Sequence, residues 1–336
     1  MLKNKTLLIT GGTGSFGKHC AIYLLKNYNL KKLIIFSRDE LKQFHMANEI
    51  EKYKKNTKVR FFLGDVRDKD RLNLAFNEVD YVIHAAALKQ IPAAEYNPQE
   101  CIRTNINGAE NIIFSAIEKR VKKVIALSTD KACNPINLYG ATKLAADKLF
   151  VAGNTLTGKI KKPVFSVVRY GNVINSRGSV VPLFKKIFLS KKNIYPITDY
   201  EMTRFFISLD DSVRFVLKSF ERMKGGEIFI PKLPTIKIID IVKTLDPKAK
   251  MNCIGIRPGE KIHEILASKD DSRNTISFKD HYVIAPNLDF NSFKNYLRNN
   301  LSEKGKKIQN DFEYISSNLD DRLKKNQIKK ILNSEK

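Results

Sequence analysis

The first half of the chain alternates short apolar runs with longer stretches in which apolar residues recur at helical spacing. Short apolar runs separated by helices are typical of strands buried on both faces of a parallel sheet. Right-handed crossovers through the intervening helices would cover both faces of that sheet. The pattern predicts strands at Thr6–Thr10, Lys32–Ser37, Val59–Leu63, Tyr81–Ala85, Val124–Ser128 and Val164–Arg169.

We therefore expect an α/β fold in which residues 1–170 form a doubly wound parallel sheet, a Rossmann domain. The regular alternation ends after Tyr170 and gives way to loops with scattered helices and strands. Residues 171–300 are predicted to form a smaller C-terminal substrate-binding lobe, with part of 205–232 completing the sheet domain. Such a lobe would lie over the carboxyl ends of the strands, where ligands of these sheets bind.

The final segment has a different character. From about Leu301 the sequence is polar and charged, with only a modest helical pattern. We expect residues 301–336 to form a charged tail that is a peripheral helix or partly disordered.

The amino-acid composition limits the classes of protein to which the chain can belong. The 336 residues have 43% hydrophobic content, which is enough for a large buried core. Four scattered cysteines, together with the spacings of His84 and His263, fit neither a metal site nor a disulfide framework, and His84 is expected to be buried in its strand. The chain shows no signal peptide pattern and no apolar run long enough to span a membrane. We expect a cytoplasmic protein without a metal, bound to no membrane.

The charge is strongly positive, because 60 Lys and Arg residues stand against 35 Asp and Glu residues for a net charge of +25. Such a field favours nucleic acid, anionic membrane surfaces or small phosphorylated substrates. The lysines are spread along the whole chain, and no basic block is interleaved with aromatic residues. We therefore interpret the charge as lysine-rich solvated faces and expect no binding to nucleic acid.

A glycine-rich turn follows the first predicted strand and opens a helix. Its glycines are Gly11, Gly14 and Gly17, and Thr13, Ser15 and Phe16 lie between them. Small residues let the backbone approach a pyrophosphate, and the helix N-terminus offers N–H donors and a favourable dipole. This context predicts a dinucleotide site, although a tight turn between strand and helix needs glycine as well.

The end of the second predicted strand bears on the choice of dinucleotide. Ser37 and Arg38 offer a hydroxyl and a guanidinium that suit the extra phosphate of NADP. Asp39 keeps NAD open, because its carboxylate could bind a ribose diol, but it could equally cap the next helix. We predict NADP. The other residues expected at the cofactor are Glu40, Lys42, Asp65, Val66, Ala85, Ala87, Lys89 and Val173.

Tyr139 and Lys143 provide candidate chemistry. Four residues apart on a predicted helix, they share one face, where the ammonium can lower the pKa of the phenol and make it a usable base. Thr129, Asp130 and Lys131 end the fifth predicted strand, where the active-site crevice of such a sheet should be. With a dinucleotide seat nearby, these residues predict hydride transfer at a carbinol carbon.

With these residues in place, the chain resembles the extended short-chain dehydrogenases/reductases. More narrowly it is similar to the inverting UDP-N-acetylglucosamine 4,6-dehydratases of the pseudaminic acid pathway, over roughly residues 3 to 300. Dehydratases of the dTDP-glucose type carry Thr-Asp-Glu where this chain has Thr129-Asp130-Lys131. The matching stretches are Thr10–Gly17, Ser37–Glu40, Ala85–Gln90, Leu127–Ala132, Leu138–Lys143, Arg169–Val173, Ser176–Val180, Met202–Phe205 and Arg257–Lys261.

The resemblance implies a dehydration without net oxidation, in which hydride passes transiently to NADP. Tyr139 would remove the proton of the sugar's 4-hydroxyl, and Lys143 would bind the cofactor ribose. Lys131 would be the base at C5, and Asp130 the acid at the departing C6 hydroxyl. To act as a base Lys131 must lose its charge, so we expect burial or nearby positive charge to lower its pKa.

The resemblance also implies the substrate, UDP-N-acetylglucosamine, and a homo-oligomer such as a hexamer. The alternatives are a retaining UDP-sugar 4,6-dehydratase or a UDP-sugar epimerase of capsule or O-antigen synthesis, and, from another class, a non-catalytic NADP sensor or a nucleic-acid binder. The residues expected at the substrate are Lys89, Asn172, Ser176, Arg177, Gly178, Ser179, Val180, Thr198, Arg257 and Glu260.

Overall fold

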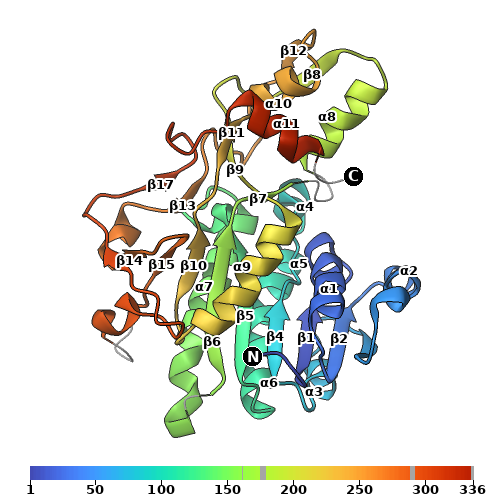
Figure 1. Ribbon diagram of the computed structural model, residues 1–336, viewed down its shortest axis with the longest axis vertical. Coiled ribbons are helices and arrows are strands. Elements are labelled where there is room, and N and C mark those ends of the chain that lie inside the picture. The colour runs from blue at the N-terminus through green and yellow to red at the C-terminus, as the bar shows by residue number, and fades with distance from the viewer. Residues whose placement is uncertain (161, 175–178, 288–291, 334–336) are drawn as a thin grey trace.

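The computed structural model describes the chain except for residues 161, 175–178, 288–291 and 334–336. A large sheet with helices on both faces forms the lower part of the molecule in Figure 1, and a smaller lobe lies above it. The predicted α/β class with a doubly wound sheet is confirmed. No described helix combines the length and apolar character needed to cross a membrane.

The large sheet has ten strands in the order β16-β14-β15-β10-β6-β5-β4-β1-β2-β3. The seven strands from β10 to β3 are parallel to one another, which is the doubly wound order, and the six strands predicted in the first half are all among them. The parallel strands are β1 (Thr6–Thr10), β2 (Lys32–Ser37), β3 (Lys58–Leu63), β4 (Tyr81–His84), β5 (Lys123–Thr129), β6 (Val164–Tyr170) and β10 (Ile228–Pro231).

Helices cover both faces because the central strands are apolar on both sides; all residues of β1 and β4, for example, are buried. On one face α1 packs against α2 and α9, and on the other α6 packs against α3 and α7 (Figure 1). The helices of this domain are α1 (Ser15–Asn27), α2 (Glu40–Ile50), α3 (Lys69–Ala75), α4 (Ile91–Tyr96), α5 (Pro98–Ile102), α6 (Gly108–Glu118), α7 (Leu138–Ala152) and α9 (Leu209–Arg222).

Three antiparallel strands extend the sheet beyond β10. They are β15 (His281–Ile284), β14 (Thr275–Ser277) and β16 (Lys306–Lys307). The sequence prediction assigned residues 171–300 to the lobe apart from a portion of 205–232, whereas β14 and β15 belong to the large sheet. Their short lengths gave no periodic signal by which the sequence could place them.

The lobe begins where β6 ends, because β7 follows after Gly171 and pairs with β9. A Cβ at Gly171 would lie 2.5 Å from the Phe205 Cβ, so glycine permits this close approach. A second hydrophobic core, around Phe184, Tyr195 and Ile241, holds the lobe together. Its elements are β7 (Asn172–Val173), α8 (Val180–Leu189), β8 (Ile194–Ile197), β9 (Thr203–Ile207), β11 (Thr235–Lys237), α10 (Ile238–Leu245) and β12 (Lys250–Cys253).

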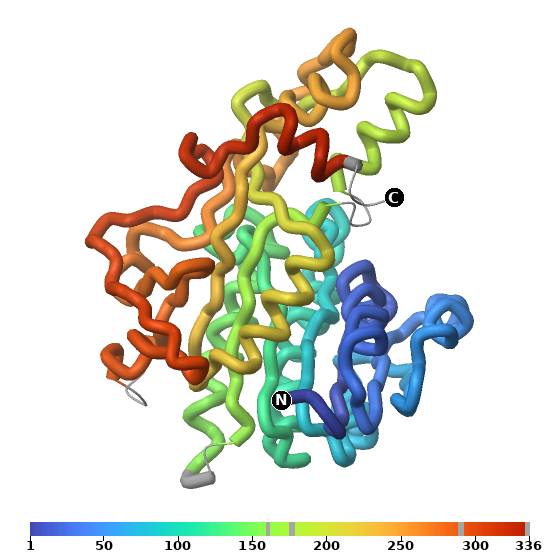
Figure 2. The backbone as a smooth tube through the Cα atoms, in the orientation of Figure 1, coloured from blue at the N-terminus to red at the C-terminus, as the bar shows by residue number. Residues whose placement is uncertain are grey.

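The segment after Leu301 is more than the peripheral or partly disordered tail that the sequence predicted. It adds β16 to the large sheet, pairs β17 (Tyr314–Ile315) with β13 (Ile265–Ala267), and ends in α11 (Lys325–Asn333) against α10. Figure 2 shows this segment, in red, running from the edge of the large sheet up to the lobe. Its few apolar residues pack against buried residues that are distant in the sequence. The polar composition of the segment therefore wrongly indicated a peripheral or partly disordered tail.

Replacement of Ile328 tests whether α11 is part of the lobe core. Ile328 is 1% exposed and belongs to the second core, whereas Lys329 beside it is exposed. Ile328→Ala should lower the free energy of unfolding by about 2–5 kcal/mol, the usual cost of truncating a buried isoleucine. Lys329→Ala should change it by less than about 0.5 kcal/mol. Urea titration followed by circular dichroism measures both, and equal effects would contradict the packing of α11.

Candidate active site

The glycine-rich turn after β1 has the backbone geometry of a dinucleotide seat. Gly11 has φ of +63°, and a Cβ there would lie 2.8 Å from the backbone nitrogen of Ala86. A Cβ at Gly17 would lie 2.6 Å from the Cα of Gly12. Larger residues at Gly11 and Gly17 would therefore close the turn or push α1 away from it.

The N-terminus of α1 follows directly on the glycine-rich turn. Gly14 is the N-cap residue and, as a glycine, has no side chain with which to cap the helix. The positive end of the helix dipole favours a phosphate at this place. This turn fits the pyrophosphate of a dinucleotide, and Thr13, Ser15 and Phe16 border it in the sequence.

At the end of β2, Asp39 caps α2: its carboxylate accepts a hydrogen bond from the backbone of Lys42 and forms an ion pair with the Lys42 ammonium. Arg38 is exposed and lies 3.4 Å from Asp65. Ser37 is buried, and its hydroxyl accepts a hydrogen bond from Gln43. The capping alternative for Asp39 is thus the observed one, while Glu40 is exposed at the start of α2 and Val66 is buried.

The loop after β4 lies directly over the turn. Thr10 accepts hydrogen bonds from the backbone nitrogens of Ala85 and Ala86 at 3.2 and 3.4 Å, which fixes the start of the loop. His84 lies in its strand as predicted, 1% exposed and 2.8 Å from Thr10 Oγ1. Ala87 is half-buried and Lys89 is exposed; partial burial, and then the ammonium of Lys131, lower the pKa of Lys89.

The end of β5 places two predicted catalytic residues in a 3-10 turn, η3 (Asp130–Ala132). Asp130 is 1% exposed; its Oδ1 accepts from the Thr129 hydroxyl at 2.8 Å and from Lys131 Nζ at 3.1 Å. Asp130 Oδ2 is buried and has no hydrogen-bond partner among the described residues. Its carboxylate therefore has one oxygen left for a proton or a hydroxyl.

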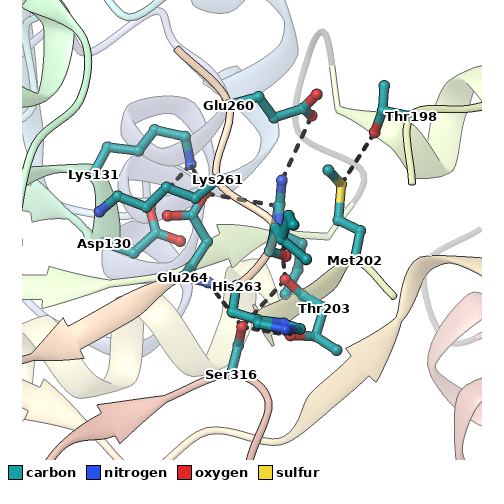
Figure 3. A network of polar contacts seen from close by, with 12 residues as sticks. Asp130, Lys131, Thr198, Met202, Thr203, Glu260, Lys261, His263, Glu264 and Ser316 are labelled. Carbon is teal, nitrogen blue, oxygen red and sulfur yellow. Dashed lines mark hydrogen bonds and ion pairs between the residues drawn. The ribbon is translucent and has the colours of Figure 1, made fainter. Parts of the chain in front are cut away.

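Glu264, which sequence reasoning missed, completes this cluster. Its Oε1 lies 3.2 Å from Lys131 Nζ and 3.7 Å from Arg204 Nε, and Arg204 reaches Glu260 at 3.5 Å. Figure 3 shows Asp130, Lys131 and Glu264 together at one end of this network. Glu264 stands three residues after the matched stretch Arg257–Lys261, and Arg204 stands within Met202–Phe205; those positions were the available signals.

The pKa of Lys131 is raised, whereas the sequence predicted that it would be lowered. Burial disfavours its charged form, but the carboxylates of Asp130 and Glu264 outweigh burial and raise the pKa of the amine. Lys131 is therefore an ammonium ion between two anions, against the repulsion from Arg204. The sequence placed Asp130 beside Lys131, but we expected burial and nearby positive charge to prevail, and the second carboxylate, Glu264, was missed.

Tyr139 also has neighbours other than those predicted. Burial raises the pKa of Tyr139 to about 12, while the ammonium of Lys131 and a hydrogen bond with the Thr129 side chain oppose that rise. Lys143 is buried and donates a hydrogen bond from Nζ to the carbonyl of Leu127 at 2.7 Å. The group that lowers the phenol's pKa is thus Lys131, and Lys143 is held by the backbone of β5.

The close approach of α7 to η3 brings Tyr139 and Lys131 together. A Cβ at Gly140 would lie 2.2 Å from the carbonyl oxygen of Lys131. Asn137 caps α7 by accepting from the backbone of Gly140 at 2.8 Å, and it donates to the carbonyl of Gly259 at 2.7 Å. The loop of the lobe that contains Gly259 is thereby attached to the start of the helix that contains Tyr139.

The residues predicted at the substrate are more dispersed. Asn172 lies in β7 beside Val173, which was predicted at the cofactor; Ser179 and Val180 stand at the start of α8. Ser176, Arg177 and Gly178 lie outside the described residues. Among the described residues, Asn172, Ser179 and Val180 are at the start of the lobe and have no hydrogen bond or ion pair with the Asp130 cluster.

Three further predicted substrate residues lie in the lobe. Thr198 is 9% exposed, and its hydroxyl lies 3.2 Å from Met202 Sδ, at the far end of the network in Figure 3. Arg257 is exposed, and its backbone nitrogen donates to Glu260 at 3.4 Å. Of the three, only Glu260 is joined to the Asp130 cluster, through Arg204.

Comparison with models of known protein families shows to which family the chain belongs. The chain matches the model described as polysaccharide biosynthesis protein over residues 7–286. Together with the doubly wound sheet and the Tyr139 cluster, this match means that the chain belongs to that family, within the extended short-chain dehydrogenases/reductases.

Individual relatives agree with the resemblance that the sequence indicated. A Campylobacter jejuni protein named UDP-N-acetylglucosamine 4,6-dehydratase (inverting) is 57% identical over 319 residues, covering 95% of this chain and 94% of its own. A Rickettsia bellii protein named UDP-glucose 4-epimerase is 43% identical over 340 residues, covering 99% and 96%. The solved structure of Pen from Bacillus thuringiensis aligns with a TM-score of 0.88 at 33% identity, covering 100% and 99%.

Substitution of Gly140 tests the contact between α7 and η3. In an ordinary helix, Gly→Ala stabilises by about 0.5–1 kcal/mol. Here the new methyl group would meet the Lys131 carbonyl, so Gly140→Ala should instead destabilise by about 1–3 kcal/mol. Ala141→Gly, at an exposed position of the same helix, measures the propensity effect alone. Urea titration gives both values, and a stabilised Gly140→Ala variant would refute the close approach.

Proposed function

We propose that this protein dehydrates UDP-N-acetylglucosamine to a UDP-4-keto-6-deoxy-N-acetylhexosamine, with inversion at C5. The observation that carries the proposal is the meeting of Tyr139 with Asp130 and Lys131 at one place, since a phenol, an acid and an amine are the groups that this reaction requires. The 57% identical relative named for that reaction supports it.

Three side chains of the protein would carry out the proton transfers. Tyr139 would act as the phenolate when it takes the proton of the 4-hydroxyl; the positive charge of Lys131 and the Thr129 side chain favour this form against the burial that raises the pKa of the phenol. Asp130 gives a proton to the departing C6 hydroxyl, and its unpartnered oxygen is suited to that contact. Lys131 first passes its ammonium proton to the Asp130 carboxylate 3.1 Å away, which makes Asp130 the acid, and the resulting neutral amine then accepts the C5 proton.

A bound nicotinamide dinucleotide would supply the carbon that takes up and returns hydride, so the reaction has no net oxidation. The glycine-rich turn before α1 would hold its pyrophosphate, and Lys143 its ribose. We favour NADP over NAD because Asp39 is engaged in capping α2, while the Arg38 guanidinium is exposed beside Ser37.

The wider setting of the reaction is also part of the proposal. The product class fits the first step of pseudaminic acid-type nonulosonate synthesis in the cytoplasm. Lys89, Asn172, Arg257 and Glu260, with the start of α8, would contact the UDP-sugar. A homo-oligomer is proposed from the resemblance.

A UDP-sugar epimerase is the second candidate, favoured by the 43% identical relative named UDP-glucose 4-epimerase. The two functions differ in their products. An epimerase conserves the mass of its substrate, whereas a dehydratase removes one water.

Incubation with UDP-N-acetylglucosamine in heavy water tests the proposed function. The product should lack one water and carry deuterium at C5, seen by mass spectrometry and NMR. Lys131→Ala should retain cofactor binding but lose at least ~100-fold in C5 exchange, because general base catalysis typically contributes that much. Exposed Lys329 gives the control variant Lys329→Ala. A product of unchanged mass would favour the epimerase, and unchanged exchange in Lys131→Ala would remove Lys131 from the mechanism.

Arg38 should decide the preference between dinucleotides. Arg38→Ala should weaken NADP binding by about tenfold or more, since a charged hydrogen bond is worth about 1.5–3 kcal/mol, and leave NAD binding unchanged. Arg60→Ala, at an exposed position of β3, is the control. Titration calorimetry on the cofactor-stripped protein measures the affinities, and an equal loss for both dinucleotides would contradict the assignment.

A further inference from the structure

Glu264 is a buried acid that has no role in the proposed mechanism. The residue is 1% exposed, and its Oε2 has no hydrogen-bond partner among the described residues. A carboxylate so far from water is costly unless a cation compensates it. The nearest compensation is Lys131 at 3.2 Å, and Arg204 Nε follows at 3.7 Å.

The backbone fixes Glu264 on both sides. Its N–H donates to Ser316 Oγ at 2.9 Å, and its carbonyl accepts from the backbone nitrogen of Ser316 at 2.8 Å. Ser316 is itself buried, and its hydroxyl lies 2.7 Å from the Thr203 hydroxyl. The segment around Ser316 thus fixes the backbone position from which the Glu264 carboxylate reaches Lys131, as Figure 3 shows.

Lys131 is less deeply buried than Glu264 and has a longer, unbranched side chain. Its side chain is 22% exposed, against 2% for the side chain of Glu264. A flexible amine whose second carboxylate neighbour is the adjacent Asp130 would lack a fixed direction without a distant anchor. Glu264 provides that anchor from the opposite side of the site.

We propose that Glu264 is a positioning residue that anchors the Lys131 amine and sets the pH at which this amine can accept a proton. The inference rests on the proposed function only in assigning that proton to C5 of the sugar. A fixed negative charge at hydrogen-bond distance stabilises the ammonium form, so Lys131 stays charged until conditions in the site favour release of its proton.

Every charged group that faces Lys131 enters this balance. Asp130 on η3 and Glu264 before β13 favour the ammonium, whereas Arg204 on β9 disfavours it. Lys89, after β4, and Tyr139 on α7 also interact with the Lys131 charge. Asp130 has its own proposed role as the acid, so Glu264 is the anion that can be neutralised without removing a reacting group.

Glu264→Gln is the decisive variant, because it keeps size and hydrogen-bonding shape but removes the charge. The fraction of Lys131 acetylated by a trace of acetic anhydride, mapped by mass spectrometry across a pH series, reports the deprotonation of that amine. The midpoint should move about one to three pH units lower in Glu264→Gln. Glu201→Gln, an exposed carboxylate of the lobe paired with Lys237, should leave it unchanged.

The same variants should also shift the pH dependence of the reaction. The acid limb of C5 exchange with UDP-N-acetylglucosamine should move to lower pH in Glu264→Gln by the same amount as the acetylation midpoint. A merely structural role would lower activity at every pH without moving either curve. Equal midpoints in Glu264→Gln and the unmodified protein would overturn the inference.

Two precautions keep the outcome decisive. If circular dichroism shows that Glu264→Gln does not fold, Glu264→Asp takes its place: it keeps the charge but withdraws it by one carbon, and should give a smaller shift in the same direction. If the unmodified protein dehydrates no UDP-N-acetylglucosamine, the proposed function fails, while acetylation still decides whether Glu264 governs Lys131.

Discussion

The ammonium of Lys131 between two buried carboxylates is the interaction on which the site depends. Asp130 stands at the end of β5 and Glu264 directly before β13, so one cation joins two segments that are distant in the sequence. Without it, two anions would face each other away from water, which is strongly unfavourable. The same cation lowers the cost of ionising Tyr139, and thereby links the pairing of these segments to the acidity of a phenol.

Much of the fold could be predicted because its signals are local. Each parallel strand is a short apolar run, and the turn at Gly11 to Gly17 is recognised by its glycine spacing together with the strand before it and the helix after it. The C-terminal segment could not be predicted in this way. Ile328 and Tyr314 are buried by residues of α10, β9 and β11 that are distant in sequence, and the charged residues around them dominate any local average.

The sequence predicted the site residues that lie close together along the chain, but not the one that is distant from them. Asp130, Lys131 and Tyr139 lie close in sequence, and helical spacing correctly put Lys143 on the inner face of α7. Spacing does not give distances, however, so it could not tell that Lys143 binds the Leu127 carbonyl or that Lys131 is the cation acting on Tyr139. Glu264 contributes from a position more than a hundred residues away, and only the folded chain reveals the anion that keeps Lys131 charged.

The pairing of Ser316 with Glu264 has a consequence for how the protein is made. Ribosomes release a chain from its N-terminus onward, and domains commonly begin to fold during synthesis. The doubly wound sheet has most of its strands by Pro231, yet the strand partner that fixes Glu264 is translated later than any parallel strand. A nascent chain can therefore possess the cofactor-binding fold before it possesses a complete proton-transfer centre, which forms only after the segment around Ser316 has been translated.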